Sequence, residues 1–544
     1  LEEQTGVRYP WESYSQIPVQ DFMYGAMENT MATVFGDFFL VDARGFLDRV
    51  YIDVNVHELT HQWFGDYVTA RSSKNSWLQE SFATFYPKLF RRAYFGQDDY
   101  QWMRRQEQLS ALNATQSDRY PIVHSQAGGA RIYQKGSAIL DMMMYTFGEA
   151  EFKAVIQYYL RKHSYANVET VDLYHAFQDT LGIVPDWFFG QWLYRGGEPQ
   201  YEVSFADVQV KGSSGRQTEV LVRQTHATDE LVNLFKMPVV FEVHYSDGTS
   251  GATRAWVERE TEKIIIPNPA GKPVAFVLFD PGSMILKKVV FQKSFQELKA
   301  QALSAPLMID RYDAVVAMRT IALDVKREAL VQAYEKNTFH AVRSEIVAQL
   351  ANDPHATARS LLKRSLLSES TPVRFSVLSN ATPIPPELME PFEQLLKDSS
   401  YAIVALALEK LSSEFPQHVA RYVDLTKLEE GMSHEIRVKW LEVQGRGGDE
   451  ASIKGLVALV GPSYEFRTRT NALEALKRLN YLDSDLLPHL FDALTHFNSR
   501  LRAPAASVAA YFFQQTAYAD QLKKYYRSRT WKGWQREILD RVIR

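Results

Sequence analysis

The sequence predicts a multidomain α+β protein, because its 544 residues change texture twice along the chain. Residues 1–198 combine an opening extended segment with helical patterns. Residues 199–292 contain short β runs such as YEVSFADVQV and VVFEVHY, and the turn Ser246–Gly248 follows one of them. Residues 293–544 are helical in pattern to the end. We therefore expect three domains with these boundaries, a number that fits the length.

The composition is that of an ordinary globular protein and argues against several classes of function. Hydrophobic residues make up 46% and charged residues 23%, and the net charge of −4 gives no electrostatic case for nucleic acid or anionic membranes. The chain has no cysteine, which excludes disulfides, thiol catalysis and cysteine-bound metals. The longest uncharged run, Ala503–Ala519, contains a proline, a serine and two glutamines, so we expect no membrane span. A cytoplasmic monomer is favoured, and a periplasmic or secreted location stays open.

The stretch DVNVHELTHQWFGDYVT in the first domain predicts metal binding. On a helix over Val50–Phe64, His57 and His61 lie on one face, about 6 Å apart along the axis. Two imidazoles so arranged can bind one zinc ion, and Glu58 lies beside them. Gly65 suits the end of such a helix, because glycine adopts the left-handed conformation of a C-cap.

A third ligand follows in the segment SWLQESFATFYPKLF. Glu80 comes after His61 with eighteen residues between them, in a second helical pattern beyond a polar, loop-like stretch. Two histidines and one glutamate, with a fourth position open for water, form the ligand set of a hydrolytic zinc site. A surface histidine pair with a solvated glutamate is the plainer interpretation of H-E-x-x-H alone, and the spacing to Glu80 weakens it. We expect one Zn²⁺ per chain.

Several motifs together resemble one family of enzymes. HELTHQWFGDYVT followed by WLQESFA closely resembles the zinc aminopeptidases of the aminopeptidase N and puromycin-sensitive type, which are gluzincin metallopeptidases. YGAMENT matches their G-A-M-E-N signature, IYQKGSAIL resembles their tyrosine-containing segment, and FFGQWLYRGGEPQ resembles the end of their catalytic domain. The resemblance is strong over residues 1–200 and architectural beyond. It implies a thermolysin-like zinc catalytic domain followed by a small β-sandwich and a helical-repeat domain.

The expected roles combine chemistry with this resemblance. A glutamate beside the zinc-bound water would take its proton and deliver it to the leaving amine. By resemblance, a tyrosine donates a hydrogen bond to the developing oxyanion, and the G-A-M-E-N strand binds the peptide through its edge. The carboxylate in that strand would pair with the free amino terminus, and its methionine borders the first side-chain pocket. The expected residues are Glu58 and Tyr133 for catalysis, His57, His61 and Glu80 for zinc, and Gly25, Ala26, Met27, Glu28 and Asn29 for the substrate.

A weak repeat runs through the last domain, where arginine or aromatic residues open apolar helices at steps of 27 to 36 residues. Such steps suit stacked helix pairs of the HEAT or armadillo type. The irregular spacing leaves a non-repetitive helical bundle as an alternative. The copies open at Arg311, Arg343, Arg374, Tyr401, Arg437, Arg467 and Arg502.

The chain departs from the family pattern around the third ligand. Ser72, Ser73 and Asn75 stand where tryptophans and an aspartate are usual, and Gln79 and Ser81 flank Glu80 in place of asparagine and glycine. None of these replaces a ligand, so they put the shape of the pocket in doubt and not its chemistry.

The amino-terminal side also departs from the family. The chain starts at Leu1, only 24 residues ahead of Gly25 and without an initiator methionine, where the family carries a β-rich domain and further strands. We expect it to be the carboxy-terminal part of a longer protein.

Three other functions compete with an aminopeptidase acting on peptides with a free amino terminus. A thermolysin-type zinc endopeptidase shares H-E-x-x-H but lacks a carboxylate reserved for an amine, so Glu28 discriminates against it. A non-catalytic peptide-binding scaffold is disfavoured because every expected ligand is retained. A double activity like that of leukotriene hydrolases is disfavoured because that branch has glycine where this chain has Ala26.

Overall fold

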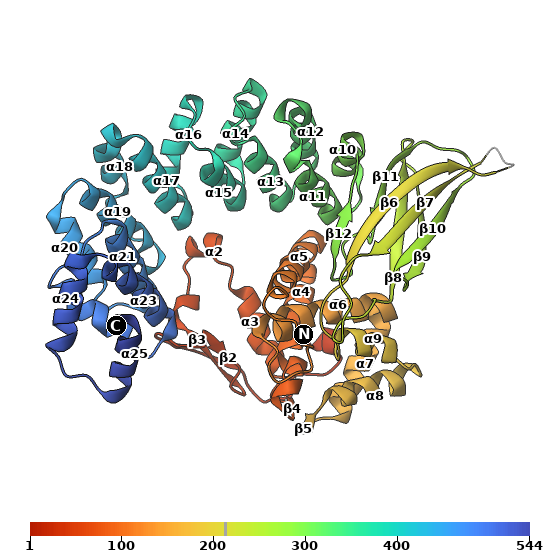
Figure 1. The fold of residues 1–544 in the computed structure, drawn as a ribbon, viewed down its shortest axis with the longest axis horizontal. Helices are drawn as coiled ribbons and strands as arrows, with labels where there is room; N and C mark the ends of the chain where they lie inside the picture. Colours follow the sequence, from red (N-terminus) through yellow and green to blue (C-terminus); the bar gives the residue numbers. More distant parts are fainter. Residues whose placement is uncertain (212–214, 544) are drawn as a thin grey trace. The chain divides into compact units, whose positions relative to one another are not determined.

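The computed structural model describes residues 1–211 and 215–543, and its fold is a mixture of helices and strands (Figure 1). The expected α+β class is therefore confirmed. No described helix is both long and apolar enough to span a membrane. The chain forms two compact units, and the expected division at residues 198 and 292 stays a prediction. The first unit comprises residues 1–15, 28–33 and 52–346, and the second comprises 16–27, 34–51 and 347–544.

Two helices of the first unit pack along their lengths. Helix α3 spans Ile52–His61 and helix α4 spans Trp77–Tyr94. They run in opposite directions: Arg91, near the end of α4, donates two hydrogen bonds of 2.7 Å to Asp53 at the start of α3. Buried aromatic rings of α4 fill the core beneath them, which anchors both helices. These rings are Trp77, Phe82, Phe85 and Tyr86.

Shorter elements surround this helix pair in the first unit. A short π-helical turn over Arg131–Lys135 follows α5 in the chain and leads directly into α6. The elements are α1 (Glu2–Thr5), α5 (Gln97–Ala114), α6 (Gly136–Phe147), α7 (Glu149–Lys162), α8 (Thr170–Leu181), α9 (Asp186–Trp192), and the parallel pair β4 (Val68–Ala70) and β5 (Ala166–Val168).

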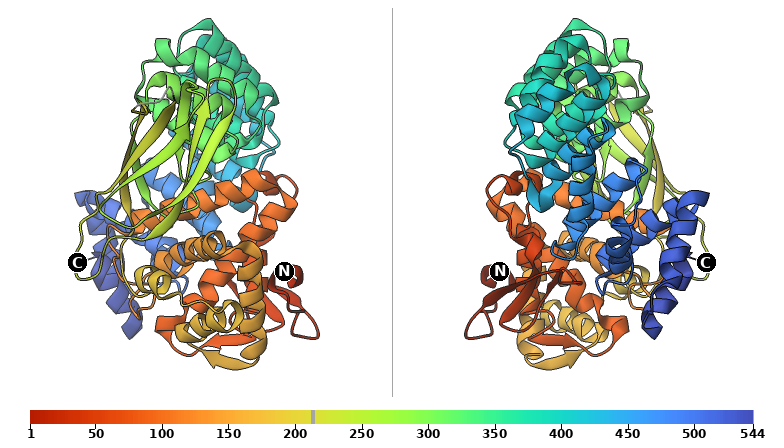
Figure 2. Two further views of the ribbon diagram at one scale, coloured as in Figure 1. Left: turned by 90° about the vertical axis from the view of Figure 1, so that its right-hand side faces the viewer. Right: turned by 90° about the vertical axis from the view of Figure 1, so that its left-hand side faces the viewer.

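Seven strands follow in the described part of residues 200–291 and form two sheets (Figure 2). Strand order is β10-β7-β6-β12 in one sheet and β11-β8-β9 in the other. Tyr201 of the first sheet meets Phe279 of the second with ring centroids 5.3 Å apart, so the sheets share a core. The strands are β6 (Gln200–Gln209), β7 (Arg216–Gln224), β8 (Met237–Tyr245), β9 (Ser250–Val257), β10 (Thr261–Asn268), β11 (Val274–Phe279) and β12 (Lys288–Phe291).

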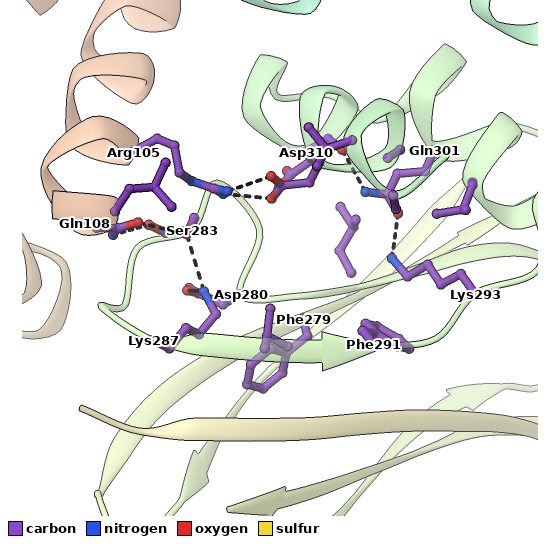
Figure 3. A pocket seen from close by; sticks show the side chains of 18 of the residues that line it. Arg105, Gln108, Phe279, Asp280, Ser283, Lys287, Phe291, Lys293, Gln301 and Asp310 are labelled. Atoms are coloured by element: carbon purple, nitrogen blue, oxygen red, sulfur yellow. Dashed lines mark hydrogen bonds and ion pairs between the residues drawn. The ribbon is translucent and has the colours of Figure 1, made fainter. Parts of the chain in front are cut away.

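Helices α10 (Phe295–Ser304), α11 (Met308–Ala317) and α12 (Leu323–Lys336) continue the first unit. A cavity of about 310 Å³ lies among α5, α10, α11 and the ends of β11 and β12. Two lysines in its wall have polar partners: Lys287 donates to the Asp280 carboxylate at 2.6 Å, and Lys293 donates to the Gln301 amide oxygen at 2.5 Å (Figure 3).

The second unit is mainly helical, and helix α13 (His340–Leu350) leads into it. Alternate helices pack on one another in a row (Figure 1). The row consists of α15 (Thr371–Asn380), α17 (Tyr401–Glu414), α19 (Glu435–Arg446), α21 (Phe466–Arg478) and α23 (Ser499–Phe513). The intervening and final helices are α14 (Ala356–Ser368), α16 (Met389–Gln394), α18 (Val419–Thr426), α20 (Glu450–Leu459), α22 (Leu486–Leu494), α24 (Thr516–Arg527) and α25 (Gly533–Ile543).

A small sheet has the order β1-β3-β2, so β2 is an edge strand among the described residues. Its strands are β1 (Ser15–Val19), β2 (Ala26–Met27) and β3 (Ala32–Gly36). The segment before β2 is held within the second unit, because Asn498 donates to the Asp21 carbonyl at 3.0 Å and Arg500 donates to the Tyr24 carbonyl at 3.1 Å.

Candidate active site

Helix α3 brings together three of the residues expected from the sequence. The Nε2 atoms of His57 and His61 lie 3.1 Å apart, as the four-residue spacing predicts. Nδ1 of His61 lies 2.9 Å from the Phe64 carbonyl, which fixes the ring so that Nε2 faces His57. Glu58 is buried beside them, with 6% of its surface exposed.

The end of this helix differs from the prediction. Helix α3 ends at His61, three residues before the expected end. The chain turns away because Trp63 packs against the amino-terminal segment, where its indole N–H donates to the Val7 carbonyl at 3.1 Å. Gly65 was wrongly expected to cap the helix: its φ is +144° and its amide pairs with the Val68 carbonyl.

Helix α4 carries Glu80 in its first turn and directs it at the two imidazoles. Oε2 of Glu80 lies 3.3 Å from Nε2 of His61 and 3.6 Å from Nε2 of His57. The three side chains that were expected to bind zinc therefore converge.

These three atoms fit a zinc ion. A tetrahedral zinc with ligand bonds of about 2.0–2.1 Å separates its ligand atoms by about 3.3 Å, close to the distances between His57, His61 and Glu80. Oε2 of Glu80 is buried and has no hydrogen-bond partner. An ionised oxygen in that situation is costly unless a cation meets it. The geometry and the unpaired oxygen both suit a metal at this position.

The electrostatics of the site also favour a cation. Burial raises the pKa of Glu58 to about 8. Burial alone would lower the pKa of His61, but the negative charge of Glu80, whose Oε2 lies 3.3 Å from Nε2 of His61, and that of the other nearby carboxylates outweigh it and raise the pKa to about 9. Burial lowers the pKa of His57. The raised pKa of His61 reports a negative potential from the surrounding carboxylates, and a metal cation would meet the same potential.

Glu28 lies next to the metal-binding cluster. Its Oε1 is 4.0 Å from Nδ1 of His61, and Glu28, Glu58 and His61 form a second group of close ligand atoms. The buried Gln62 donates to the Glu28 carbonyl at 3.0 Å and accepts from the Met31 amide at 2.9 Å. A side chain adjacent to His61 therefore ties the Glu28 backbone to α3. The sequence analysis missed Gln62, which occupies no ligand position in the motif.

The strand that was expected to bind the substrate is shorter than the sequence predicted. Strand β2 contains only Ala26 and Met27, so Glu28 and Asn29 lie just beyond it. Gly25 precedes the strand with φ +90°, a conformation that side chains rarely adopt. Glu28 therefore does not stand in the strand where it was expected, and the hydrogen bond from Gln62 holds its backbone. Gly25 to Met27 belong to the second unit, whereas Glu28 and Asn29 belong to the first.

Tyr133 stands on the π-helical turn over Arg131–Lys135. Its ring stacks on the ring of His57, with centroids 5.9 Å apart and planes 8° from parallel. Burial, and then the negative charge of Glu80, raise the pKa of Tyr133 above its ordinary value, so the phenol stays protonated and can donate a hydrogen bond. π-Helical turns occur often at functional sites.

Residues 195–199, RGGEP, stand in the segment that resembles the end of the family's catalytic domain, and they support this turn. Glu198 is buried and forms ion pairs with Arg131 and with Lys135, whose Nζ lies 3.1 Å away. Lys135 also donates to the Gly197 carbonyl at 2.9 Å. Burial would raise the pKa of Glu198, but Lys135 and Arg131 outweigh it and lower the pKa. Both ends of the tyrosine turn are thus fixed by one carboxylate.

Three of the five residues that depart from the family pattern are held in the fold by hydrogen bonds, whereas Ser72 and Ser73 are exposed. Asn75 is buried and accepts hydrogen bonds from the amide and hydroxyl of Thr170 at 3.0 and 2.8 Å. Gln79 accepts from the Ala70 amide at 2.9 Å. Ser81 is fully buried and donates to the Ile132 carbonyl at 2.7 Å.

Part of the chain is similar in sequence to known aminopeptidases. Residues 1–192 match the peptidase family M1 domain. The chain is 28% identical to leucyl aminopeptidase of Saccharolobus solfataricus over 43% of this chain and 32% of that protein. It is 31% identical to aminopeptidase N of Haemonchus contortus over 36% of this chain and 23% of that protein. These matches therefore span less than a third of either relative.

A solved structure is similar over the whole chain. The crystal structure of Legionella pneumophila aminopeptidase A in complex with aspartic acid covers 100% of this chain and 72% of its own, with a TM-score of 0.66 and 16% identity. At that identity the likeness concerns the fold. Over residues 1–192, which match the peptidase family M1 domain, the resemblance predicted from the sequence motifs is confirmed.

Proposed function

We propose that this chain carries the catalytic centre of a zinc-dependent aminopeptidase, which hydrolyses the first peptide bond of peptides with a free amino terminus. One observation carries the proposal: the carboxylate of Glu28 lies 4.0 Å from His61, beside the cluster of His57, His61 and Glu80. A carboxylate reserved for an amine, next to a hydrolytic metal set, suits removal of single terminal residues.

His57, His61 and Glu80 would hold the zinc ion, which when bound polarises a carbonyl and lowers the pKa of a water. Glu58 acts as general base and then as general acid. Its burial next to these ligands and its raised pKa suit a group that takes a proton from the attacking water and gives it to the leaving amine.

Tyr133 stabilises the negative charge that develops on the carbonyl oxygen. Its phenol stays protonated, and its ring lies against His57, at the edge of the metal-binding cluster. A hydrogen-bond donor that is already oriented contributes to the transition state without reorganisation.

The substrate is held by its amino terminus. Glu28 pairs with the α-ammonium group through a charge-assisted hydrogen bond. Gly25 precedes the edge strand β2 and Ala26 begins it, and neither has a bulky side chain, so an extended peptide can pair with that edge. Asn29 lies beyond the strand, and Met27 borders the first side-chain pocket.

The proposed architecture is a thermolysin-like domain at 1–198, a β-sandwich at 199–292 and a helical-repeat domain at 293–544. The shared core of the two sheets supports the β-sandwich. The row of alternate helices supports the repeat, because its members begin near the residues at which the sequence repeat was expected to open.

Metal analysis and a blocked substrate test the proposed function together. We expect one zinc per chain in the natively purified protein, and loss of activity on exhaustive chelation. A peptide should lose its first residue, and the same peptide with an acetylated amine should not be cleaved. Internal cleavage of acetylated peptides at comparable rates would favour a thermolysin-type endopeptidase. Peptide binding without stoichiometric zinc and without cleavage would favour a scaffold.

A further inference from the structure

One hydrogen bond connects the metal-binding helix with the tyrosine turn. Ser81 follows the metal ligand Glu80 directly on α4, and Ile132 directly precedes Tyr133. The hydroxyl of Ser81 donates to the carbonyl of Ile132 at 2.7 Å. Each partner is therefore a covalent neighbour of a residue in the proposed catalytic centre.

The Ser81 hydroxyl gives the π-helical turn a hydrogen-bond donor from another helix. The amide of Gly136 donates to the carbonyls of Arg131 and Tyr133 and passes over Ile132. A carbonyl in the interior of the protein costs free energy when it lacks a partner. The hydroxyl of Ser81 supplies one, although a helical serine more often bonds to a carbonyl of its own helix.

The surroundings make the contact specific. Ser81 is fully buried, so its hydroxyl is shielded from water, while Ile132 is partly buried. A Cβ at Gly136 would lie 1.8 Å from Oγ of Ser81, so the serine fits only because residue 136 is glycine. Glu198 fixes the turn at both ends through Arg131 and Lys135. The hydroxyl fixes its middle, next to the tyrosine.

We propose that Ser81 is a positioning residue, whose hydroxyl holds the π-helical turn so that the Tyr133 phenol faces the metal-binding cluster. This inference rests on the proposed function, because it acts through the role of Tyr133. It differs from a packing role, in which Ser81 only fills the space opposite Gly136. The kinetics of a double variant at Ser81 and Tyr133 distinguish the positioning role from the packing role.

The test compares Ser81→Ala in two backgrounds. In the otherwise unchanged protein we expect kcat to fall about three- to tenfold, the equivalent of one net hydrogen bond, with KM and zinc content unchanged. In the Tyr133→Phe background the same substitution should change kcat less than about twofold, because the group it orients is already gone. Ser81→Gly should behave like Ser81→Ala, since both lack the hydroxyl.

Hydrogen exchange gives a second readout that does not depend on activity. Amides of residues 131–137 should exchange up to about tenfold faster in Ser81→Ala, measured on metal-free protein, while those of α4 stay unchanged. The matched control is Ser365→Ala, which removes a buried hydroxyl that also donates to a backbone carbonyl, that of Leu361 at 2.9 Å. It should leave kcat and the exchange of the turn unaltered.

Three outcomes would overturn the inference. Equal losses in both backgrounds would show that Ser81 does not act through Tyr133. Loss of zinc in Ser81→Ala would show that it acts through Glu80. A normal kcat in Tyr133→Phe would remove the tyrosine from the proposed function and this inference with it, whereas the first two results leave the proposed function intact.

Discussion

The two halves of the candidate site are built in different ways. His57, Glu58, His61 and Glu80 stand on two regular helices, which Arg91 and Asp53 clamp together. Tyr133 stands on an irregular turn. That turn is held by Glu198 and Ser81, which are 65 and 52 residues away from Tyr133 in the sequence.

This difference indicates how substitutions should affect each half of the candidate site. In the helical half, geometry follows from helical spacing and a shared aromatic core, so a single polar substitution that spares the three proposed ligands should alter the chemistry and leave the metal in position. In the turn, geometry depends on a few buried polar contacts. Substitutions there should alter the rate while metal content and substrate binding stay the same. The predictions below separate these two behaviours.

The largest effect is expected for Glu58→Gln in the helical half. The amide cannot accept a proton from water, and general-base catalysis contributes about 10²–10⁴ in rate. We expect a loss of about 10³ in kcat with one zinc per chain retained. Steady-state kinetics with elemental analysis check this, and a variant that keeps normal turnover would remove Glu58 from its role.

Tyr133→Phe should show the behaviour of the turn. It removes only the phenolic hydroxyl, so we expect kcat to fall about a hundredfold or more while KM changes little. The fold and the zinc content should remain, because Glu198 and Ser81 still hold the turn. If KM rose in proportion to the loss in kcat/KM, the hydroxyl would serve substrate binding and not the transition state.

Glu28→Gln should affect substrate binding more than the chemical step. A charge-assisted hydrogen bond to the α-ammonium contributes about 1.5–3 kcal/mol, so kcat/KM should fall about 10- to 150-fold with a raised KM. The Gln62 contact to the Glu28 backbone is unaffected by the change, so zinc should stay bound. Kinetics on a peptide and metal analysis check both points. Unchanged KM would argue that another group binds the amine.

The smallest effect on catalysis is expected for Asp53→Asn, which weakens the clamp between α3 and α4. The loss of a half-buried ion pair should lower the free energy of unfolding by about 1 kcal/mol, with kcat within twofold of normal. Thermal unfolding and kinetics measure these effects. Glu149→Gln is the matched control, because its pair with Arg92 is more exposed and should contribute less. A large loss of zinc in Asp53→Asn would mean that the core alone does not hold the helix pair.

Sequence reasoning succeeded where spacing along one element sets the geometry. The convergence of His57 and His61 follows from 3.6 residues per turn, and the α+β class follows from the change of periodicity along the chain. It failed where a distant contact decides. Helix α3 ends early because Trp63 bonds to the amino-terminal segment, and Glu28 is fixed by Gln62 instead of its own strand.

Glu198 and Ser81, which hold the tyrosine turn, could not be predicted from the sequence, because their contacts with the turn are also between distant residues. Glu198 lies in a Gly- and Pro-containing stretch that has the composition of a boundary, and no local pattern pairs it with Arg131. Ser81 was noted only as a departure from the family. An unusual serine at 81 together with a glycine at 136 could have suggested a contact. The two residues lie in different segments, so no pattern along a single segment connects them.

The contact between Ser81 and Gly136 constrains the order in which the two positions can change over evolution. Any side chain at 136 collides with a serine at 81, since the nearest approach would be 1.8 Å. A serine can therefore be gained at 81 only in an ancestor that already has glycine at 136, and that glycine cannot be lost while the serine remains. The pair should co-vary among related sequences, and a designer who wants a stiffer helix α6 must first return residue 81 to glycine.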